Sequence, residues 1–326
     1  MLEVIEAGLL STLQDRPRDT AMLGVSPGGA CDRTALRALE RLVNGRGVVE
    51  MTLLGATFAV REPCVVGLTG ADFSGQIVEE GRLLRPGTTA LLHRGTTLRF
   101  DAAIDGARAY LALAGGIDVA EIFGSRSTCL AGGFGGVEGR PLRPGDIVRA
   151  VHPGRLDLAG RWWPGAVSGE LPEPDVTPIR VVLGPHVAHV GSRALDVLLG
   201  TEWWLDPRSD RMGLRLEGVP ILAAVPEAVG ESGELLSLPM VQGAVQLPPG
   251  EAPIVLLADH QTVGGYPAPL VVASVDLPRL AQLRPGDVLR FEGITLDEAF
   301  RLSTAELRSV RAADEAFERW LKALPA

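Results

Sequence analysis

The polar residues best suited to catalysis gather in one short segment, residues 258–267, which reads ADHQTVGGYP. This segment follows the apolar run PIVLLA and precedes the apolar run LVVAS, so its polar side chains are expected where a strand ends. Asp259 or His260 could act as a general acid or base. Gly264 and Gly265 would let a ligand approach the backbone and its N–H groups closely. The alternative is a polar hairpin that satisfies its own backbone through an Asx turn.

A glycine-rich segment at residues 115–136 is a second candidate, because GGID, GSRST and GGFGG follow one another within it. Arg126, together with the hydroxyl of Ser127, could hold a carboxylate or a phosphate through bidentate hydrogen bonds. The segment has no P-loop lysine, and it has no GxGxxG between a strand and a helix. A plain turn is therefore the alternative.

Two shorter segments also place charged residues in turns. In SDRMG, residues 209–213, Asp210 and Arg211 either contact a ligand or form a local ion pair that shapes the turn. Asp15 lies in TLQDR, and Asp32 follows SPGGAC at the start of an expected helix, whose N-terminus could bind an anion. For Asp32 the alternative is a cap, in which its carboxylate accepts a hydrogen bond from the first helical turn.

Other kinds of site are disfavoured. His186 and His189 lie three residues apart, but no third metal ligand is near them in the sequence. The serine in GSRST lacks a GxSxG context. The three cysteines, Cys31, Cys64 and Cys129, are far apart and form no CxxC. The sequence therefore predicts no metal site, no serine triad and no disulfide framework.

The composition of the 326 residues restricts the function further. Lys322 is the single lysine among 31 basic residues, which argues against a P-loop, a Schiff-base lysine or a biotinylated lysine. The formal net charge of −9 argues against nucleic acid or an anionic membrane as a partner. The N-terminus MLEVIEAGLL has no basic region, and no apolar run approaches the roughly 20 residues that span a bilayer. We therefore expect a cytoplasmic protein.

Many short β-like runs, separated by turns such as RPGT, TGAD and RPGD, predict a mainly β fold. Helices are expected after Asp32, over residues 187–199 and over residues 296–324, the last opened by a capping box at residues 295–298. An apolar stripe on this last helix either packs on the core or makes a contact with another protomer, and a break near Ser303 is left open. The expected strands cover residues 65–68, 89–92, 96–100, 109–113, 147–151, 179–183, 254–258, 270–275 and 288–291.

An internal repeat divides the chain. LRPGDIVR at residues 142–149 matches LRPGDVLR at residues 283–290, which indicates either two related lobes or only a common type of turn. The predicted domains are an N-terminal β lobe (1–160), a Pro-rich linker (161–178), a C-terminal β lobe (179–294) and a C-terminal helical extension (295–326).

Nine blocks, in this order over residues 3–292, resemble the allophanate hydrolase subunit 2 family, also called KipA-like. They are LSTLQD, SPGGACD, LTGAD, RAYLALAGGID, GSRST, GGFGGVEGRPLRPGD, SDRMGLRLEG, VQGAVQLPP and ADHQTVGGYP. That family includes the C subunit of bacterial 5-oxoprolinase and one half of the carboxyltransferase region of urea carboxylases. The resemblance implies two cyclophilin-like β-barrel lobes with a few short helices and a C-terminal helix.

The resemblance also implies partners and cofactors. Such a C subunit is expected to act with a KipI-like B subunit, which belongs to the allophanate hydrolase subunit 1 family. Together they would activate 5-oxoproline with shared ATP, and an A subunit would then complete ring opening to glutamate. One alternative is a carboxyltransferase component that acts on urea or a similar amide, with biotin on a separate carrier. The other is a non-catalytic, KipA-like regulatory partner.

Candidate site residues are carried over from the matching blocks. Asp259 and Asp210 suit proton transfer, and the glycines with Tyr266 suit close approach to a planar lactam or ureido ring. Four positions depart from the family pattern: Ala268 stands where lysine is usual, His260 where arginine is frequent, Cys31 where methionine is usual and Cys129 where a polar residue is common. The substrate- and anion-binding candidates are Arg126, Ser127, Arg211, His260, Gln261, Thr262, Gly264, Gly265, Tyr266, Asp15 and Asp32.

Overall fold

The chain folds into two compact units in the computed structural model, which describes residues 1–169, 176–221 and 235–323. Part of the predicted linker, residues 170–175, lies outside the described residues. The first unit consists of Met1–Pro17, Gly28–Glu170 and Glu306–Ala326, and the second of Arg18–Pro27 and Leu171–Ala305. The segment Arg18–Pro27 therefore belongs to the second unit although its neighbours in the sequence belong to the first. The last helix contributes residues to both units.

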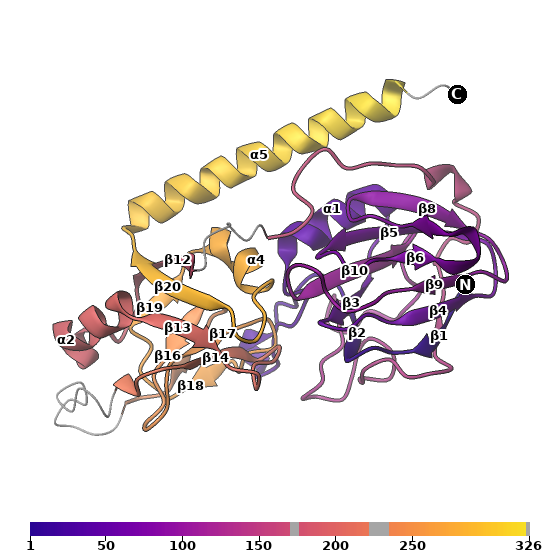
Figure 1. Ribbon diagram of the computed structural model, residues 1–326. Helices are drawn as coiled ribbons and strands as arrows, with labels where there is room; N and C mark the ends of the chain where they lie inside the picture. The colour runs from indigo at the N-terminus through magenta and orange to yellow at the C-terminus, as the bar shows by residue number, and fades with distance from the viewer. Residues whose placement is uncertain (170–175, 222–234, 324–326) are drawn as a thin grey trace. The chain divides into compact units, whose positions relative to one another are not determined.

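The first unit is built from two antiparallel sheets, coloured from indigo to magenta in Figure 1. One sheet has the strand order β11-β1-β4-β9-β6-β7 and the other β2-β3-β10-β5-β8. Side chains of both sheets form one core, in which Phe58, Leu68 and Phe73 are fully buried. The strands are β1 (Leu2–Glu6), β2 (Leu10–Gln14), β3 (Val48–Thr52), β4 (Thr57–Val60), β5 (Cys64–Gly70), β6 (Gln76–Ile77), β7 (Arg82–Leu83), β8 (Thr88–Leu92), β9 (Thr97–Arg99), β10 (Arg108–Leu113) and β11 (Ile147–Val148).

Helix α1 (Arg33–Val43) packs on strands β5 and β10. It begins where predicted, because the Oδ1 atom of Asp32 accepts a hydrogen bond of 3.0 Å from the backbone N–H of Ala35. It ends at Asn44, which adopts a left-handed conformation with φ of 48°. Its apolar face is buried, so the predicted amphipathic helix is confirmed.

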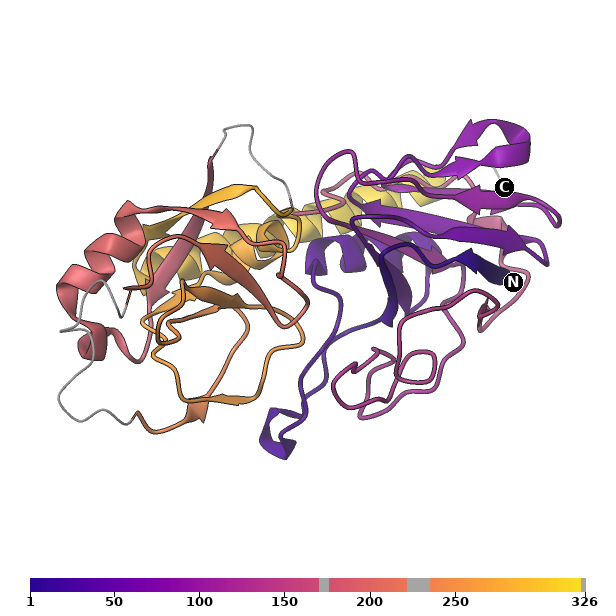
Figure 2. The same ribbon diagram turned by 60° about the horizontal axis from the view of Figure 1, so that its bottom comes forward.

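The second unit contains a closed barrel with the strand order β12-β19-β16-β17-β14-β13-β20, whose strands are labelled in Figure 1 and coloured from pink to orange in Figure 2. Trp203, Leu289 and Phe291 are among the buried side chains that fill it. The mainly β class predicted from the sequence is confirmed. The strands are β12 (Val176–Leu183), β13 (Glu202–Leu205), β14 (Gly213–Glu217), β15 (Leu238–Pro239), β16 (Ala244–Gln246), β17 (Ile254–Leu256), β18 (Val263–Gly264), β19 (Leu270–Val272) and β20 (Val288–Gly293).

Short helices complete the two units. Helix α2 (Val187–Gly200) lies where predicted and is interrupted at Gly191, which has φ of 73°. Helix α4 (Leu277–Leu280) follows strand β19. The described 3-10 turns are η1 (Ala21–Leu23), η2 (Val78–Glu80), η3 (Leu156–Leu158) and η5 (Ser274–Asp276).

The two LRPGD repeats adopt the same turn. Their glycines have positive φ values, 91° at Gly145 and 88° at Gly286, as the third position of a type II turn requires. In each copy the aspartate side chain accepts a hydrogen bond of 2.7 Å from the backbone N–H of the arginine three residues earlier. The leading residues, Leu142 and Leu283, are buried in the cores of their respective units. The repeat thus anchors equivalent turns in the two units.

Helix α5 (Leu296–Ala323) is continuous through Ser303, so no break occurs there. The Thr295 hydroxyl accepts a hydrogen bond of 3.2 Å from the backbone N–H of Glu298, which confirms the predicted start. In the second half of the helix, Phe317 is buried against Trp163, with ring centroids 5.3 Å apart. The apolar residues Leu296, Phe300 and Leu307 of the first half are instead exposed. The predicted core packing therefore holds for the second half only.

Candidate functional site

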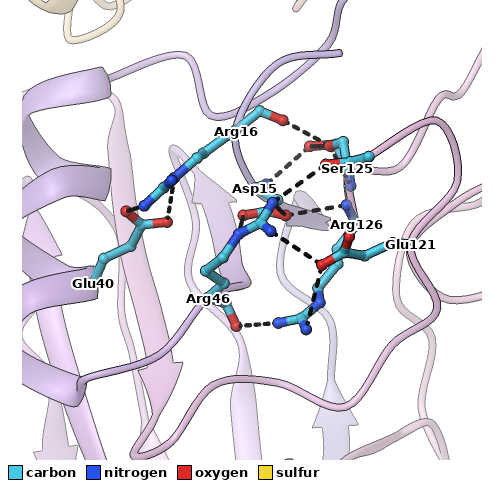
Figure 3. A network of polar contacts seen from close by, with 9 residues as sticks. Asp15, Arg16, Glu40, Arg46, Glu121, Ser125 and Arg126 are labelled. Carbon is cyan, nitrogen blue, oxygen red and sulfur yellow. Dashed lines mark hydrogen bonds and ion pairs between the residues drawn. The ribbon is translucent and has the colours of Figure 1, made fainter.

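Asp15 lies just after strand β2 and is the centre of a polar network in the first unit (Figure 3). Its side chain is fully buried. The Oδ2 atom accepts a hydrogen bond of 2.7 Å from Nη2 of Arg46, and Oδ1 accepts one of 3.3 Å from Nε of the same residue. The backbone N–H of Arg126 adds a third bond of 3.1 Å to Oδ2. The guanidinium of Arg46 therefore compensates the buried carboxylate.

The GSRST turn, residues 124–128, contributes further hydrogen bonds to this network. The hydroxyl of Ser127 accepts a hydrogen bond of 2.9 Å from the backbone N–H of Asp15, and the hydroxyl of Ser125 donates one of 2.6 Å to the carbonyl of Arg16. Both serines are fully buried. The side chain of Arg126 donates to the carbonyl of Arg46 at 3.1 Å. The structure thus brings together three residues singled out in the sequence, namely Asp15, Arg126 and Ser127.

Arg46 and Glu121 belong to the same network but were not singled out from the sequence. Nη1 of Arg46 donates to Glu121 at 3.0 Å, and Nη2 of Arg126 lies 3.6 Å from the same carboxylate (Figure 3). The available signal was the NGRG turn after helix α1, in which Arg46 is the third residue after the helix. A turn of this kind gives no indication of which distant acid its arginine will meet.

In the second unit, Arg211 and Asp259 form a bidentate ion pair. Nε and Nη2 of Arg211 donate to the two carboxylate oxygens at 2.9 and 3.0 Å. A backbone bond of 2.9 Å from the N–H of Asp259 to the carbonyl of Arg211 runs beside them. The side chain of Arg211 is only 3% exposed and that of Asp259 is 12% exposed. Two parallel hydrogen bonds between a guanidinium and a carboxylate are strong, and they hold both side chains in fixed positions.

Asp210 takes no part in the Arg211–Asp259 ion pair and instead bonds to the backbone of its own turn. Its Oδ1 atom accepts hydrogen bonds from the backbone N–H groups of Met212, at 2.8 Å, and Gly213, at 3.2 Å. This is an Asx turn just before strand β14, and it fixes the backbone on both sides of Arg211. Arg211 pairs with Asp259, so the local ion pair between Asp210 and Arg211 that the sequence left open is not the one that forms. A catalytic role for Asp210 stays a prediction.

His260 is a buried, neutral imidazole beside this pair. Its Nδ1 lies 2.7 Å from the carbonyl oxygen of Gln261, so Nδ1 donates and Nε2 is left as the acceptor of a neutral ring. Burial lowers the pKa of His260 below its usual value, against smaller raising effects from the contact with Gln261 and from Asp259. The ring therefore suits accepting a proton from a ligand at neutral pH better than carrying a fixed charge.

The amide of Gln261 and the glycines form the next part of the segment. Nε2 of Gln261 donates to Oε1 of Gln246 at 2.9 Å. A Cβ atom added at Gly264 would lie 2.6 Å from Nε2 of Gln246, whereas one at Gly265 would meet only the hydroxyl of Ser237 at 3.3 Å. A methyl group at position 264 would therefore displace the Gln246 amide, whereas one at position 265 would fit with a small shift of the hydroxyl.

Thr262 and Tyr266 complete the ADHQTVGGYP segment. Thr262 is buried, and its carbonyl accepts a hydrogen bond of 2.9 Å from the backbone N–H of Met240. Tyr266 is 47% exposed, so its ring can be reached from solvent. Asp259 thus lies just after strand β17, where it pairs with Arg211, whereas Val263 and Gly264 form strand β18 and pair with strand β15.

Ala268, where the family resemblance led us to expect a lysine, lies in an apolar setting. It is buried in a cluster with Met240, Ala244 and Leu256. Its backbone N–H donates a hydrogen bond of 3.0 Å to Nδ1 of His186. No cation therefore stands at this position beside the glycines.

The remaining sequence candidates have structural roles. Asp32 is fully buried, and besides capping helix α1 its Oδ2 accepts a hydrogen bond of 2.7 Å from the backbone N–H of Gly169. His186 and His189 stack edge to face, 5.4 Å apart. Among the described residues, no group of three or more His, Cys, Asp or Glu side chains could hold a metal ion. In the same part of the chain, no helix has the length and apolar character needed to cross a bilayer.

Comparisons with known proteins place these features in a family. A family model described as carboxyltransferase domain, subdomain A and B, matches residues 23–293. The 5-oxoprolinase C subunit of Escherichia coli (strain K12) is 33% identical over 92% of this chain and 94% of that protein. The Haemophilus influenzae protein of the same name is 31% identical over 93% and 94%. The urea amidolyase of Lachancea kluyveri is 27% identical over 96% of this chain but only 18% of that protein.

Solved structures agree with these relationships. TTHA0988 superposes with a TM-score of 0.75 at 34% identity, covering 89% of this chain and 56% of that chain. The urea carboxylase of Kluyveromyces lactis superposes with a TM-score of 0.81 at 26% identity, covering 95% of this chain and 29% of that chain. This chain thus spans just over half of TTHA0988 and less than a third of the urea carboxylase. It belongs to the carboxyltransferase-domain family, subdomains A and B, and is similar over most of its length to the C subunit of 5-oxoprolinase.

Proposed function

We propose that this chain is the C subunit of an ATP-dependent 5-oxoprolinase. The observation that carries the proposal is its similarity to two proteins that bear this name, each over more than nine tenths of both sequences. In this proposal a KipI-like B subunit joins it to activate 5-oxoproline, and an A subunit then completes ring opening to glutamate. The chain is then one component of a hydrolase and is inactive alone.

The cluster around Asp259 supports a lactam as the ligand. A lactam offers one N–H donor and one carbonyl acceptor, and a site that recognises it needs fixed partners of both kinds. The Asp259 carboxylate, held by Arg211, is a fixed acceptor. The neutral His260 ring offers a proton acceptor, and Gly265, where an added Cβ would meet only the Ser237 hydroxyl, leaves room for a ligand to approach the backbone. Tyr266, which is exposed, would cover the planar ring.

ATP would supply the phosphoryl group that activates the lactam carbonyl. The chain has no lysine apart from Lys322, so any phosphate contact it makes comes from arginine or from backbone N–H groups. ATP shared with the B subunit is compatible with this donor set. The residues of this chain would bind and orient the lactam and accept its proton.

A second candidate is a carboxyltransferase component that transfers a carboxyl group from biotin on a separate carrier to urea or a similar amide. The matching family model and the urea amidolyase relative favour it. A third is a non-catalytic regulatory partner of KipA type, which the buried alanine at position 268 favours.

The test is co-expression of this chain with the B and A subunits, followed by assays of the purified complex. Phosphate release that depends on 5-oxoproline, with glutamate as product, is the expected result. Loss of carboxybiotin on addition of urea, without turnover of 5-oxoproline, would favour the carboxyltransferase function. A folded complex that turns over neither substrate would leave the regulatory role and refute both enzymatic ones.

A further inference from the structure

The first half of helix α5 carries a row of exposed apolar side chains, which we call the α5 ridge. Its members Leu296, Phe300 and Leu307 are 73%, 76% and 55% exposed. Helix α5 is unbroken, as Figure 1 shows in yellow, so the three residues lie within an arc of about 40° at 3.6 residues per turn. Single exposed apolar residues are common on protein surfaces, but an aligned row of large ones indicates a contact with another molecule.

One flank of the α5 ridge rests on the chain itself. The hydroxyl of Ser303 lies 3.0 Å from that of Ser274 in the 3-10 turn η5, and both serines belong to the second unit. Ala299 and Leu302, on the same flank, are half-buried. Turning the helix to bury the ridge within the chain would break these contacts. The ridge is therefore fixed at the edge of the contact and faces outward.

The other flank of the α5 ridge carries opposite charges at its two ends. Asp297 lies beside the start of the ridge, and Arg308 and Arg311 lie beside its end, all three within an arc of about 60°. Among the described residues, none forms a side-chain hydrogen bond or an ion pair with these three. The helix dipole favours Asp297 in the first turn, but it gives no reason for two arginines in the middle of the helix. Between the two ends, this flank carries Arg301 and the uncharged Thr304.

We propose that the α5 ridge binds the α5 ridge of a second copy of this chain, with the two helices antiparallel. An antiparallel pair can place Phe300 of each copy opposite Leu307 of the other. Asp297 of one copy then lies between Arg308 and Arg311 of the second copy, and two-fold symmetry repeats the contact at the other end. A parallel pair would instead bring like charges together, which disfavours it.

A second copy matches the ridge because the ridge itself supplies both members of each apolar and each charged contact. The interface is limited to part of one helix, so the dimer is expected to be weak, with a Kd on the order of 10 μM. The inference goes beyond the proposed function, because it needs neither 5-oxoproline nor another subunit.

The test is sedimentation velocity of the purified full-length chain over a concentration series that brackets this Kd. We expect a monomer–dimer equilibrium. The double variant Phe300→Glu/Leu307→Glu should raise the Kd by about a hundredfold, because the dimer would then bury four unpaired carboxylates. Met22→Glu/Leu23→Glu is the matched control, since these two apolar residues are also exposed, at 97% and 65%, and the Kd should not change.

Charge reversal tests the direction of the two helices. Asp297→Arg should raise the Kd by about tenfold, because three arginines would meet at each end of the antiparallel dimer. The triple variant Asp297→Arg/Arg308→Asp/Arg311→Asp restores opposite charges at both ends and should return the Kd to its natural value. A triple variant that dimerises no better than Asp297→Arg would overturn the antiparallel pairing.

The remaining outcomes decide whether a second copy is the partner. A natural chain that stays monomeric throughout the series would overturn the proposal, and so would a dimer that the Glu double variant leaves unchanged or that the control weakens equally. A monomeric natural chain whose ridge variant loses binding to a B subunit would assign the ridge to that subunit instead. A thermal melt shows whether each variant is folded. Turnover by the assembled oxoprolinase complex is a separate measurement, so its failure would leave the dimer untouched.

Discussion

The guanidinium of Arg211 is held by the carboxylate of Asp259 through two hydrogen bonds, although 48 residues separate them in the sequence. One residue precedes strand β14 and the other follows strand β17, and these two strands are neighbours in the barrel. Sheet pairing thus brings the SDRMG and ADHQTVGGYP segments into contact. The proposed lactam site depends on this contact.

Arg211→Ala should destabilise the second unit strongly. The substitution leaves the Asp259 carboxylate, which is largely buried, without its counter-charge, and losses from breaking a buried pair are about 3–5 kcal/mol. Urea unfolding followed by circular dichroism measures the change. Arg215→Ala is the control in the same unit, because Arg215 pairs with Glu251 where both side chains are exposed (43% and 58%), and we expect a loss of no more than about 1 kcal/mol. Equal losses in the two variants would contradict the assigned role of the buried pair.

Stability should fall as the pH is lowered below about 6.5, the usual value for histidine. Burial lowers the pKa values of His260 and His186 in the folded chain, so the unfolded chain binds more protons in this window. The stabilisation is complete above the unfolded pKa and is lost as the pH falls toward the folded value. Each histidine contributes at most about 1.4 kcal/mol per pH unit.

His260→Gln should therefore make the free energy of unfolding less dependent on pH between about pH 8 and pH 5. His93→Gln, which replaces an exposed histidine in the same way, is the control. A profile for His260→Gln that is as steep as that of the natural chain would show that His260 is not held neutral.

Gly264→Ala should impair the site while Gly265→Ala should not. The added methyl group at position 264 meets the Gln246 amide at 2.6 Å and would displace it from its bond with Gln261. At position 265 the nearest atom is a flexible hydroxyl at 3.3 Å. We expect an increase in KM for 5-oxoproline in the first variant only, measured in the reconstituted complex. Similar kinetics for both variants would rule out the steric role of Gly264.

The local elements could be predicted from the sequence because their signals are local. The Asp32 cap, the Thr295 cap and the Pro-Gly turns of the two repeats all depend on residues within a few positions of one another. The periodicity of α5 predicted a helix correctly but could not tell which half of its apolar stripe is covered, because that depends on where Trp163 comes to lie.

The composition of the site could be predicted only in part. Asp259, Arg211 and the glycines were found from their residue types, but the pairing of Arg211 with Asp259 rather than with Asp210 follows from the register of β14 and β17. Arg46 was missed because its partner Asp15 lies 31 residues earlier.

The central claim is that the Asp259 cluster serves the ring opening of 5-oxoproline. The most direct measurement is 5-oxoproline-dependent ATP hydrolysis by the reconstituted complex, with Asp259→Asn compared with Asp206→Asn. Both aspartates form bidentate pairs with an arginine in the second unit, so the comparison separates the site from the effect of losing such a pair. Asp259→Asn should abolish turnover in an assembled complex, whereas Asp206→Asn should retain it. Full turnover by the Asp259→Asn complex, or no turnover by the complex with the natural chain, would contradict it.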